Sequence, residues 1–156
     1  MKLLRLVFFP LLFIACRQET APAATALPLQ GSWQLVTGIT ITGKDSTVTD
    51  YTRKLSFIKV INNTHFAFLQ HDLAGGKDSA TASFVAGGGR YQLSDSNYTE
   101  HLEYCNDRQW ENHDFNFTIS IKNDTLVQQG VEKVESAGVN RINIEKYVRI
   151  QPLAGK

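Results

Sequence analysis

The chain has 156 residues, of which 42% are hydrophobic and 20% are charged. This composition is typical of one globular domain and excludes the disordered and fibrous classes of protein. Lys and Arg number 16 against 15 Asp and Glu, so the net charge of +1 lacks the basic surplus of nucleic-acid-binding proteins. No nucleic-acid partner is therefore expected, and no apolar run reaches the roughly 20 residues that a membrane-spanning helix needs.

Residues 1–15 have the layout of a secretory signal peptide, because Lys2 and Arg5 precede a short apolar stretch. The residues Phe13-Ile14-Ala15-Cys16 resemble the lipobox of bacterial lipoproteins, with Phe13 in a position that more often holds leucine. In that family the cysteine thiol receives a diacylglyceryl group, and the chain is then cleaved on the N-terminal side of the cysteine. The resemblance implies lipidation of Cys16 and a location in the cell envelope, with ordinary secretion as the alternative.

Residues 16–29 are rich in Ala, Thr and Pro and show no hydrophobic period, which is typical of a flexible tether. Lipid chains on Cys16 would anchor the protein in a membrane without any basic surface. Cys105 is the one other cysteine, so no intramolecular disulfide is expected in the exported domain. We interpret Cys105 as a small buried side chain, with a reactive thiol as the alternative.

Residues 30–150 form the predicted domain, and 151–156 form a C-terminal tail. Apolar residues recur there with a period of two, in short segments rich in β-branched and aromatic residues, which indicates β-strands. The predicted strands are 31–41, 54–61, 65–71, 80–86, 89–93, 98–105, 113–121, 125–130 and 142–150.

Short polar joins separate most of these strands and suit antiparallel hairpins. They include Asn62-Asn63-Thr64, Gly87-Gly88, Asp95-Ser96-Asn97 and Asn123-Asp124. Sequential hairpins with no helix to cover a sheet favour closure into an all-β, up-and-down antiparallel barrel of about eight to ten strands. A two-sheet sandwich is the alternative.

Two glycine-containing segments could be taken for functional loops. Gly87-Gly88-Gly89 lacks the Lys-Ser/Thr of a phosphate loop, so we expect a sharp barrel corner or a bulge there. Residues 72–79 form a polar connection, which is either a lid at the barrel mouth or a plain solvated loop.

Gly31-Ser32-Trp33 opens the first predicted strand and Arg149 closes the last. This is similar to the lipocalins and the wider calycin barrels, in which a Gly-x-Trp packs at the closed end and an Arg or Lys of the last strand lies across the indole. Residues 30–150 also resemble the lipocalin-like domain family of uncharacterised exported lipoproteins of the Bacteroidetes. The resemblance implies a barrel fold and an exported, lipidated protein. It does not imply any particular activity. It rests on segments 65–68, 87–93, 98–102, 119–126 and 144–149.

Alternation along each strand assigns the inward face of the predicted barrel. The aromatic face of 113–121 points inward, and so does the bulkier face of 98–105. In the last strand an apolar majority at Ile142, Ile144, Val148 and Ile150 places Lys146 inside. Buried charges are costly unless paired, so Glu100 and Lys146 should meet each other or a polar ligand.

These faces predict a binding module for a small apolar or amphiphilic molecule, without catalysis, acting as a monomer and needing no cofactor. One alternative is an envelope interaction protein with a side-chain-filled barrel, and another is an enzyme with Glu100 as its base. The expected pocket walls are Tyr91, Leu102, Phe115 and Phe117, and the expected polar anchors are Tyr98, Glu100, Tyr104 and Lys146.

Metal binding and hydrolysis have weak support in the sequence. His65 and His71 share one strand face and His101 lies near Glu103, but spacing fixes no third ligand. Glu111 and Asp114, like Glu103, are best explained as solvated charges. No motif of a hydrolase nucleophile occurs.

Overall fold

The computed structural model describes residues 27–152, which form nine β-strands and two short 3₁₀-helices. The predictions for the signal peptide, for Cys16 and for residues 16–26 of the tether lie outside the described residues, as does the tail beyond residue 152. No helix within residues 27–152 is long and apolar enough to span a membrane. The elements are β1 (Gly31–Thr42), β2 (Asp45–Asp50), β3 (Leu55–Ile61), β4 (His65–Asp72), β5 (Phe84–Ser94), β6 (Asn97–Cys105), η1 (Arg108–Trp110), β7 (His113–Lys122), β8 (Thr125–Val134), η2 (Glu135–Ala137) and β9 (Val139–Arg149).

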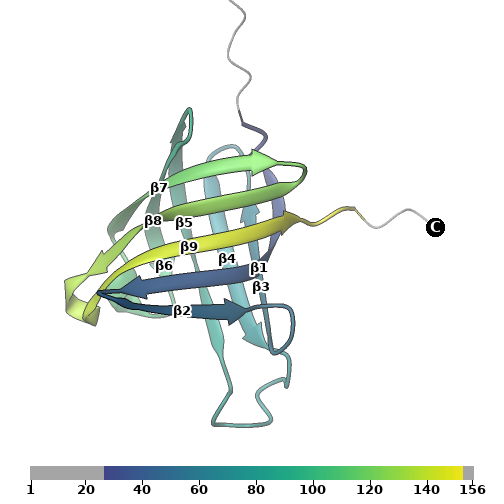
Figure 1. The fold of residues 1–156 in the computed structure, drawn as a ribbon, viewed down its shortest axis with the longest axis vertical. Coiled ribbons are helices and arrows are strands. Elements are labelled where there is room, and N and C mark those ends of the chain that lie inside the picture. The colour runs from purple at the N-terminus through teal and green to yellow at the C-terminus, as the bar shows by residue number, and fades with distance from the viewer. Residues whose placement is uncertain (1–26, 153–156) are drawn as a thin grey trace, which may run out of the picture.

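Strands β3 to β9 each pair antiparallel with the next, and β1 pairs with both β3 and β9. Eight strands therefore close into a barrel, and β2 adds a hairpin to the second half of β1. In Figure 1, β1, β8 and β9 run roughly horizontally, while β3, β4 and β5 run roughly vertically. The predicted all-β, up-and-down antiparallel barrel is confirmed and is consistent with a lipocalin-like fold, and the sandwich alternative is excluded.

The main differences from the predicted strands are in β2 and β5. Strand β2 was not predicted, because its sequence DSTVTD is exposed almost throughout and carries no apolar alternation. The two strands predicted at 80–86 and 89–93 are one continuous strand, β5, which passes through the three glycines.

The glycines of β5 lie where neighbouring chain segments approach too closely for a side chain. A Cβ at Gly87 would lie 2.6 Å from the Phe68 ring, and a Cβ at Gly88 would lie 2.5 Å from the Phe66 carbonyl oxygen. The β5–β6 register shifts between Gly88 and Gly89, which marks a bulge. The expected bulge is confirmed, whereas the hairpin expected at Gly87-Gly88 is wrong.

This bulge inverts the alternation at the end of β6. Gly88 pairs with Tyr104 and Gly89 with Leu102, so Glu103 is the extra residue of β6. Beyond it Cys105 is buried, while Tyr104 is 68% exposed. The prediction that Tyr104 faces inward is wrong, because one extra residue moves every later side chain to the opposite face.

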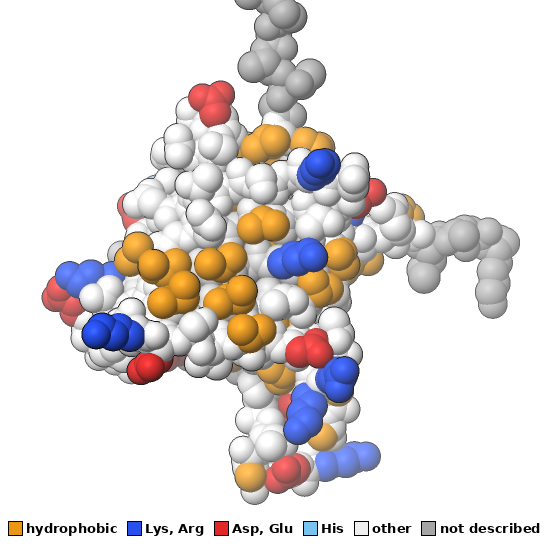
Figure 2. Space-filling view, in the orientation of Figure 1, with side chains coloured by type: hydrophobic (Ala, Val, Ile, Leu, Met, Phe, Trp, Pro, Cys, Tyr) orange, Lys and Arg blue, Asp and Glu red, His pale blue; other side chains and the backbone are white. Residues whose placement is uncertain are grey.

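The face assigned to β9 is also wrong. Asn143 and Tyr147 are buried, whereas Lys146 is exposed on the outer face. The open half of the barrel is polar on the side that β8 and β9 form, so β9 presents polar residues inward and apolar residues outward. Figure 2 shows the result as hydrophobic side chains gathered over β9 and β1. The exposed apolar residues of β2, β8 and β9 are Val48, Val131, Ile142 and Val148.

The closed end of the barrel is built around Trp33, whose side chain is fully buried. The Arg149 guanidinium lies 4.0 Å from the centroid of the Trp33 ring, so the cation–π contact implied by the lipocalin resemblance is present. Arg149 also donates to the carbonyl oxygens of Pro28 and Gln30, at 2.6 and 2.7 Å. The incoming chain is therefore fixed at this end.

The connection between β4 and β5 extends away from the barrel in Figure 1, and none of residues 73–83 lines the cavity described below. Its geometry fits the solvated loop rather than the lid. The buried Asp72 fixes the base of this connection, because the backbone N–H groups of Gly76 and Ser83 donate to its carboxylate over 3.0 and 3.1 Å. These bonds lower the pKa of Asp72 below its ordinary value of 3.8.

Because the folded-state pKa of Asp72 is lowered, its support of the loop is present above the unfolded pKa and is lost as pH falls through the folded value. We expect the amide resonances of Gly76 and Ser83 to titrate together at a pH below 3.8 in NMR spectra. Asp72→Asn should abolish this titration. Separate midpoints for the two amides would contradict a shared carboxylate.

Candidate functional site

The open half of the barrel contains a cavity of about 490 Å³. It reaches solvent at the end opposite Trp33, where Thr40, Asn106 and Trp110 form part of the rim. The closed half is filled instead by buried side chains such as Trp33 and Leu126. The barrel is therefore part solid core and part open pocket. The aromatic side chains that wall the cavity are Tyr51, Phe57, Phe68, Trp110, Phe115 and Phe117.

An ion pair forms the floor of the cavity. Lys59 on β3 donates from Nζ to Glu100 Oε1 on β6 over 2.6 Å, and to Gln128 Oε1 on β8 over 3.1 Å. Lys59 is 2% exposed and Glu100 is 6% exposed. A buried ion pair is tolerated when both charges are paired and hydrogen-bonded, and this cluster meets that condition.

Burial dominates the protonation behaviour of the floor. It raises the pKa of Glu100, and the Lys59 ammonium opposes this rise without reversing it. Burial and the adjacent Glu100 charge also raise the pKa of Tyr98. The Tyr98 hydroxyl has no hydrogen-bond partner within residues 27–152. Below the cavity there is thus a neutral hydroxyl beside an ion pair.

A second charged cluster lies near the rim, around Glu132 on β8. Its carboxylate accepts from Asn143 Nδ2 over 2.8 Å and from Arg141 Nε over 2.7 Å. The Arg141 guanidinium in turn lies 5.6 Å from the centroid of the Trp110 ring. This chain of contacts positions the Trp110 indole at the mouth of the cavity.

Glu145 on β9 is the carboxylate between these two clusters. Its Oε2 accepts a hydrogen bond of 2.7 Å from the Tyr147 hydroxyl. Burial, followed by the Glu145 charge, raises the pKa of Tyr147 well above its ordinary value, so this hydroxyl remains a donor. Within the described chain, no Lys, Arg or His side chain forms an ion pair with Glu145.

Four of the eight residues expected to bind a ligand line the cavity, and four do not. Tyr91 and Tyr98 pack against each other in a tilted arrangement at the closed end, with ring centroids 5.3 Å apart, and contribute no cavity surface. Tyr104 and Lys146 point outward, for the reasons given above. The four that line the cavity are Glu100, Leu102, Phe115 and Phe117.

Sequence reasoning missed Lys59, which replaces Lys146 as the partner of Glu100. The signal was present, because Phe57, Lys59 and Ile61 alternate along β3 and all three are buried. An inward apolar face on both sides of a lysine predicts that the lysine is inside too. Gln128 and Glu132 on β8 follow the same alternation and were also missed.

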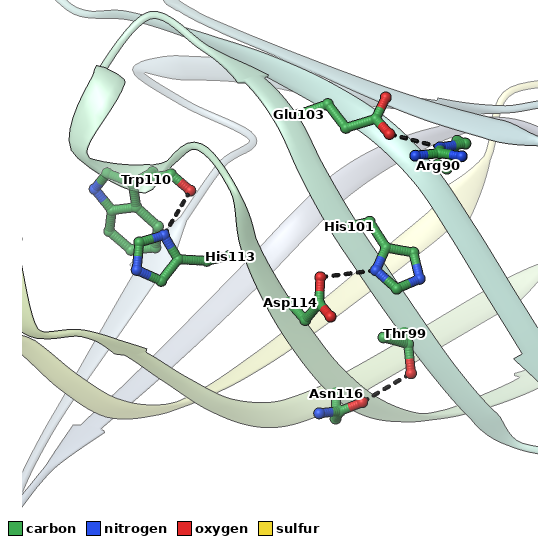
Figure 3. Close-up of polar contacts among 8 residues, drawn as sticks. All are labelled: Arg90, Thr99, His101, Glu103, Trp110, His113, Asp114 and Asn116. Carbon is green, nitrogen blue, oxygen red and sulfur yellow. Dashed lines mark hydrogen bonds and ion pairs between the residues drawn. The ribbon is translucent and has the colours of Figure 1, made fainter.

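Polar pairs cover the outer face of β5, β6 and β7 (Figure 3). His101 Nδ1 lies 2.7 Å from Asp114 Oδ1, and Arg90 Nε donates to Glu103 Oε1 over 2.6 Å. His101 Nε2 is buried, with no hydrogen-bond partner in the part of the chain that the structure describes. These groups lie outside the cavity, so they form no acid/base pair within it.

Metal-ligand geometry is likewise lacking among residues 27–152, where no three His, Cys, Asp or Glu side chains gather. His65 and His71 are both exposed on β4, and His65 Nδ1 lies 2.7 Å from the Thr64 hydroxyl. Glu111 accepts from the backbone N–H of Cys105 over 3.0 Å, and this bond lowers the pKa of Glu111.

Cys105 is the last residue of β6, and its buried side chain contributes to the cavity wall. Burial raises the pKa of its thiol. A raised pKa keeps a thiol protonated and therefore unreactive. The interpretation of Cys105 as a small buried side chain agrees with this setting.

Fold and cavity together define the class of protein, an antiparallel β-barrel whose open half is compatible with binding a small molecule. Residues 28–155 match the family model described as "Domain of unknown function (DUF4488)", and the chain belongs to this family. No curated protein matches the chain. The family match spans the whole barrel and its cavity.

Proposed function

We propose that this protein binds a small amphiphilic molecule in the open half of its barrel and does not transform it. The observation that carries this proposal is the cavity of about 490 Å³, walled by aromatic rings and floored by hydrogen-bonded polar side chains. Ligand sites usually combine an apolar wall with a few convergent polar groups in this way. The ligand's apolar body would lie against Phe115 and Phe117, with its polar end toward the floor.

The pairing of the charged groups supports binding without catalysis. Glu100, the strongest candidate for a general base, is bonded to Lys59 and is only 6% exposed. A base has to be free to accept the proton that it removes, and this carboxylate is held by the Lys59 ammonium at the cavity floor. The alternative of an interaction protein with a filled barrel loses support, because the open half is not filled.

We further propose that the protein is a monomer held in the cell envelope by lipid on Cys16, after removal of residues 1–15. The sequence pattern around Cys16 supports the anchor. The contacts of Arg149 with Pro28 and Gln30 place the incoming chain at the closed end. The anchored segment would therefore join the barrel at its closed end, opposite the cavity mouth.

Thr40→Trp is expected to abolish binding of a neutral hydrophobic probe. Thr40 lines the cavity on β1, so an indole in its place would occupy the space that the probe needs. Titration with N-phenyl-1-naphthylamine should give a saturable rise in fluorescence with the unchanged protein and no such rise with Thr40→Trp.

The matched control for this test is Ile41→Trp, one residue further along β1. Ile41 lies on the outer face, beside Ile142 and Ile144. Probe binding by the Ile41→Trp variant should equal that of the unchanged protein. The proposed function fails if the unchanged protein does not bind the probe, or if both variants lose binding equally.

A further inference from the structure

The cavity carries a surplus of negative charge. Its lining includes two cationic side chains and four carboxylates, which leaves a net charge of −2. Asp107, one of the four carboxylates, is exposed at the rim and accepts a hydrogen bond from the backbone N–H of Gln109. Glu100 and Glu132 are paired with Lys59 and Arg141, and Glu145 is the half-buried carboxylate that remains.

The neighbours of Glu145 leave its charge uncompensated. Across the sheet its partners are Gly38 on β1 and Gln128 on β8, and neither carries a charge. The Oε1 atom of Gln128 accepts from Lys59, so that amide oxygen is directed to the floor. The Tyr147 hydroxyl is the one side chain within the described residues that donates a hydrogen bond to Glu145.

Aromatic rings lie near this carboxylate. The Tyr51 ring packs over Gly38, so that a Cβ added there would lie 3.0 Å from the ring. The Phe57 ring lies between Tyr51 and Tyr147, at centroid distances of 5.9 and 6.2 Å. The Glu145 charge contributes to the raised pKa of Tyr51, after burial, which agrees with their proximity.

The cavity's own cations do not reach Glu145. Lys59 donates to Glu100 and Gln128, and its side chain is 3% exposed. Arg141 is bonded through Nε and a terminal nitrogen to Glu132, each over 2.7 Å. An anionic ligand would therefore find no free cation in the lining, and it would meet the charge of Glu145.

We propose that Glu145 receives an ammonium group of the ligand, which makes the molecule a cationic amphiphile with an apolar or aromatic body. This rests on the proposed function and deepens it. The carboxylate supplies a charge-assisted hydrogen bond, and the rings of Tyr51 and Phe57, which line the cavity, add cation–π attraction. Gly38 contributes by its lack of a side chain, which lets the Tyr51 ring pack over β1 beside the carboxylate.

The test uses three probes with the same naphthalene body and different charge: 1-naphthylmethylamine, 1-naphthylmethanol and 1-naphthoate. Each displaces N-phenyl-1-naphthylamine in competition titrations at neutral pH. The amine should bind about 10-fold or more tightly than the alcohol, as a hydrogen bond to a charged group allows, and the carboxylate should bind most weakly. This comparison needs only the unchanged protein.

Glu145→Gln should reduce the affinity for the amine to that for the alcohol and leave alcohol binding unchanged. The amide oxygen still accepts from Tyr147, so the fold should be retained. Glu135→Gln is the matched control, because the Glu135 side chain is 81% exposed outside the cavity. It should keep the full preference for the amine.

Equal binding of the three probes, or a preference for the amine that survives in Glu145→Gln, overturns the cationic assignment and leaves the proposed function standing. Failure of every probe, including N-phenyl-1-naphthylamine, overturns the proposed function and the cationic assignment with it. Preference for the amine that is lost only in Glu145→Gln supports both.

Discussion

Lys59→Met is expected to lower the free energy of unfolding by about 3 to 5 kcal/mol, the usual cost of removing one partner of a buried ion pair. The substitution leaves the Glu100 carboxylate buried with no cation, while methionine keeps most of the side-chain volume. The measurement is the midpoint of urea-induced unfolding at constant slope. The loss should be partly relieved at acidic pH, because Glu100 has a raised pKa and can be buried as the neutral acid.

Two further variants make this result specific. Adding Glu100→Gln to Lys59→Met should recover much of the lost stability, because the two side chains interact directly. Lys146→Met, on the exposed face of β9, should change the free energy of unfolding by less than about 0.5 kcal/mol. If Lys59→Met costs as little as Lys146→Met, the floor of the cavity is not held by this ion pair.

The two lysines also show how far alternation along a strand can be used. In β7 the inward face is plainly the more apolar one, so the pattern of Phe115, Phe117 and Ile119 predicts their burial correctly. In β9 both faces contain bulky residues, and the inward one is the more polar. The apolar majority fails there because β9 lines the polar side of an open cavity rather than a packed core.

The bulge at Gly88 and Gly89 sets a second limit. Three adjacent glycines predict an irregularity, and the structure contains one, but the sequence does not say which strand carries the extra residue. The extra residue is Glu103 in β6, and its position decides whether Tyr104 or Cys105 faces the cavity. Register depends on contacts between strands, which periodicity within one strand does not contain.

The candidate site was therefore predictable in its apolar part and in Glu100, but not in the polar partners of Glu100. Leu102, Phe115 and Phe117 follow from alternation within their own strands. The cluster of Lys59, Glu100 and Gln128 joins three strands that are up to 69 residues apart in sequence. The closed end was easier, because Trp33 and Arg149 match a pattern at the two ends of the domain.

Trp33→Ala is the other substitution for which a large effect is expected, about 3 to 5 kcal/mol of lost stability, as for other fully buried aromatic residues. The indole fills the closed end, donates from Nε1 to the Leu29 carbonyl oxygen over 2.8 Å and lies under the Arg149 guanidinium. Removing it leaves a cavity, breaks that hydrogen bond and removes the surface on which Arg149 stacks. Urea unfolding monitored by far-ultraviolet circular dichroism measures the loss.

Trp110→Ala is the matched control, because Trp110 is the second tryptophan of the chain and lies half-buried at the cavity mouth. Its removal should cost clearly less stability than Trp33→Ala, since its indole is partly solvated and leaves no enclosed void. It should instead weaken binding of N-phenyl-1-naphthylamine. Trp33→Ala protein that remains folded should bind this probe as tightly as the unchanged protein does. Equal stability losses for the two variants would contradict a barrel that is solid at the Trp33 end and open at the Trp110 end, because that division makes only Trp33 a core residue.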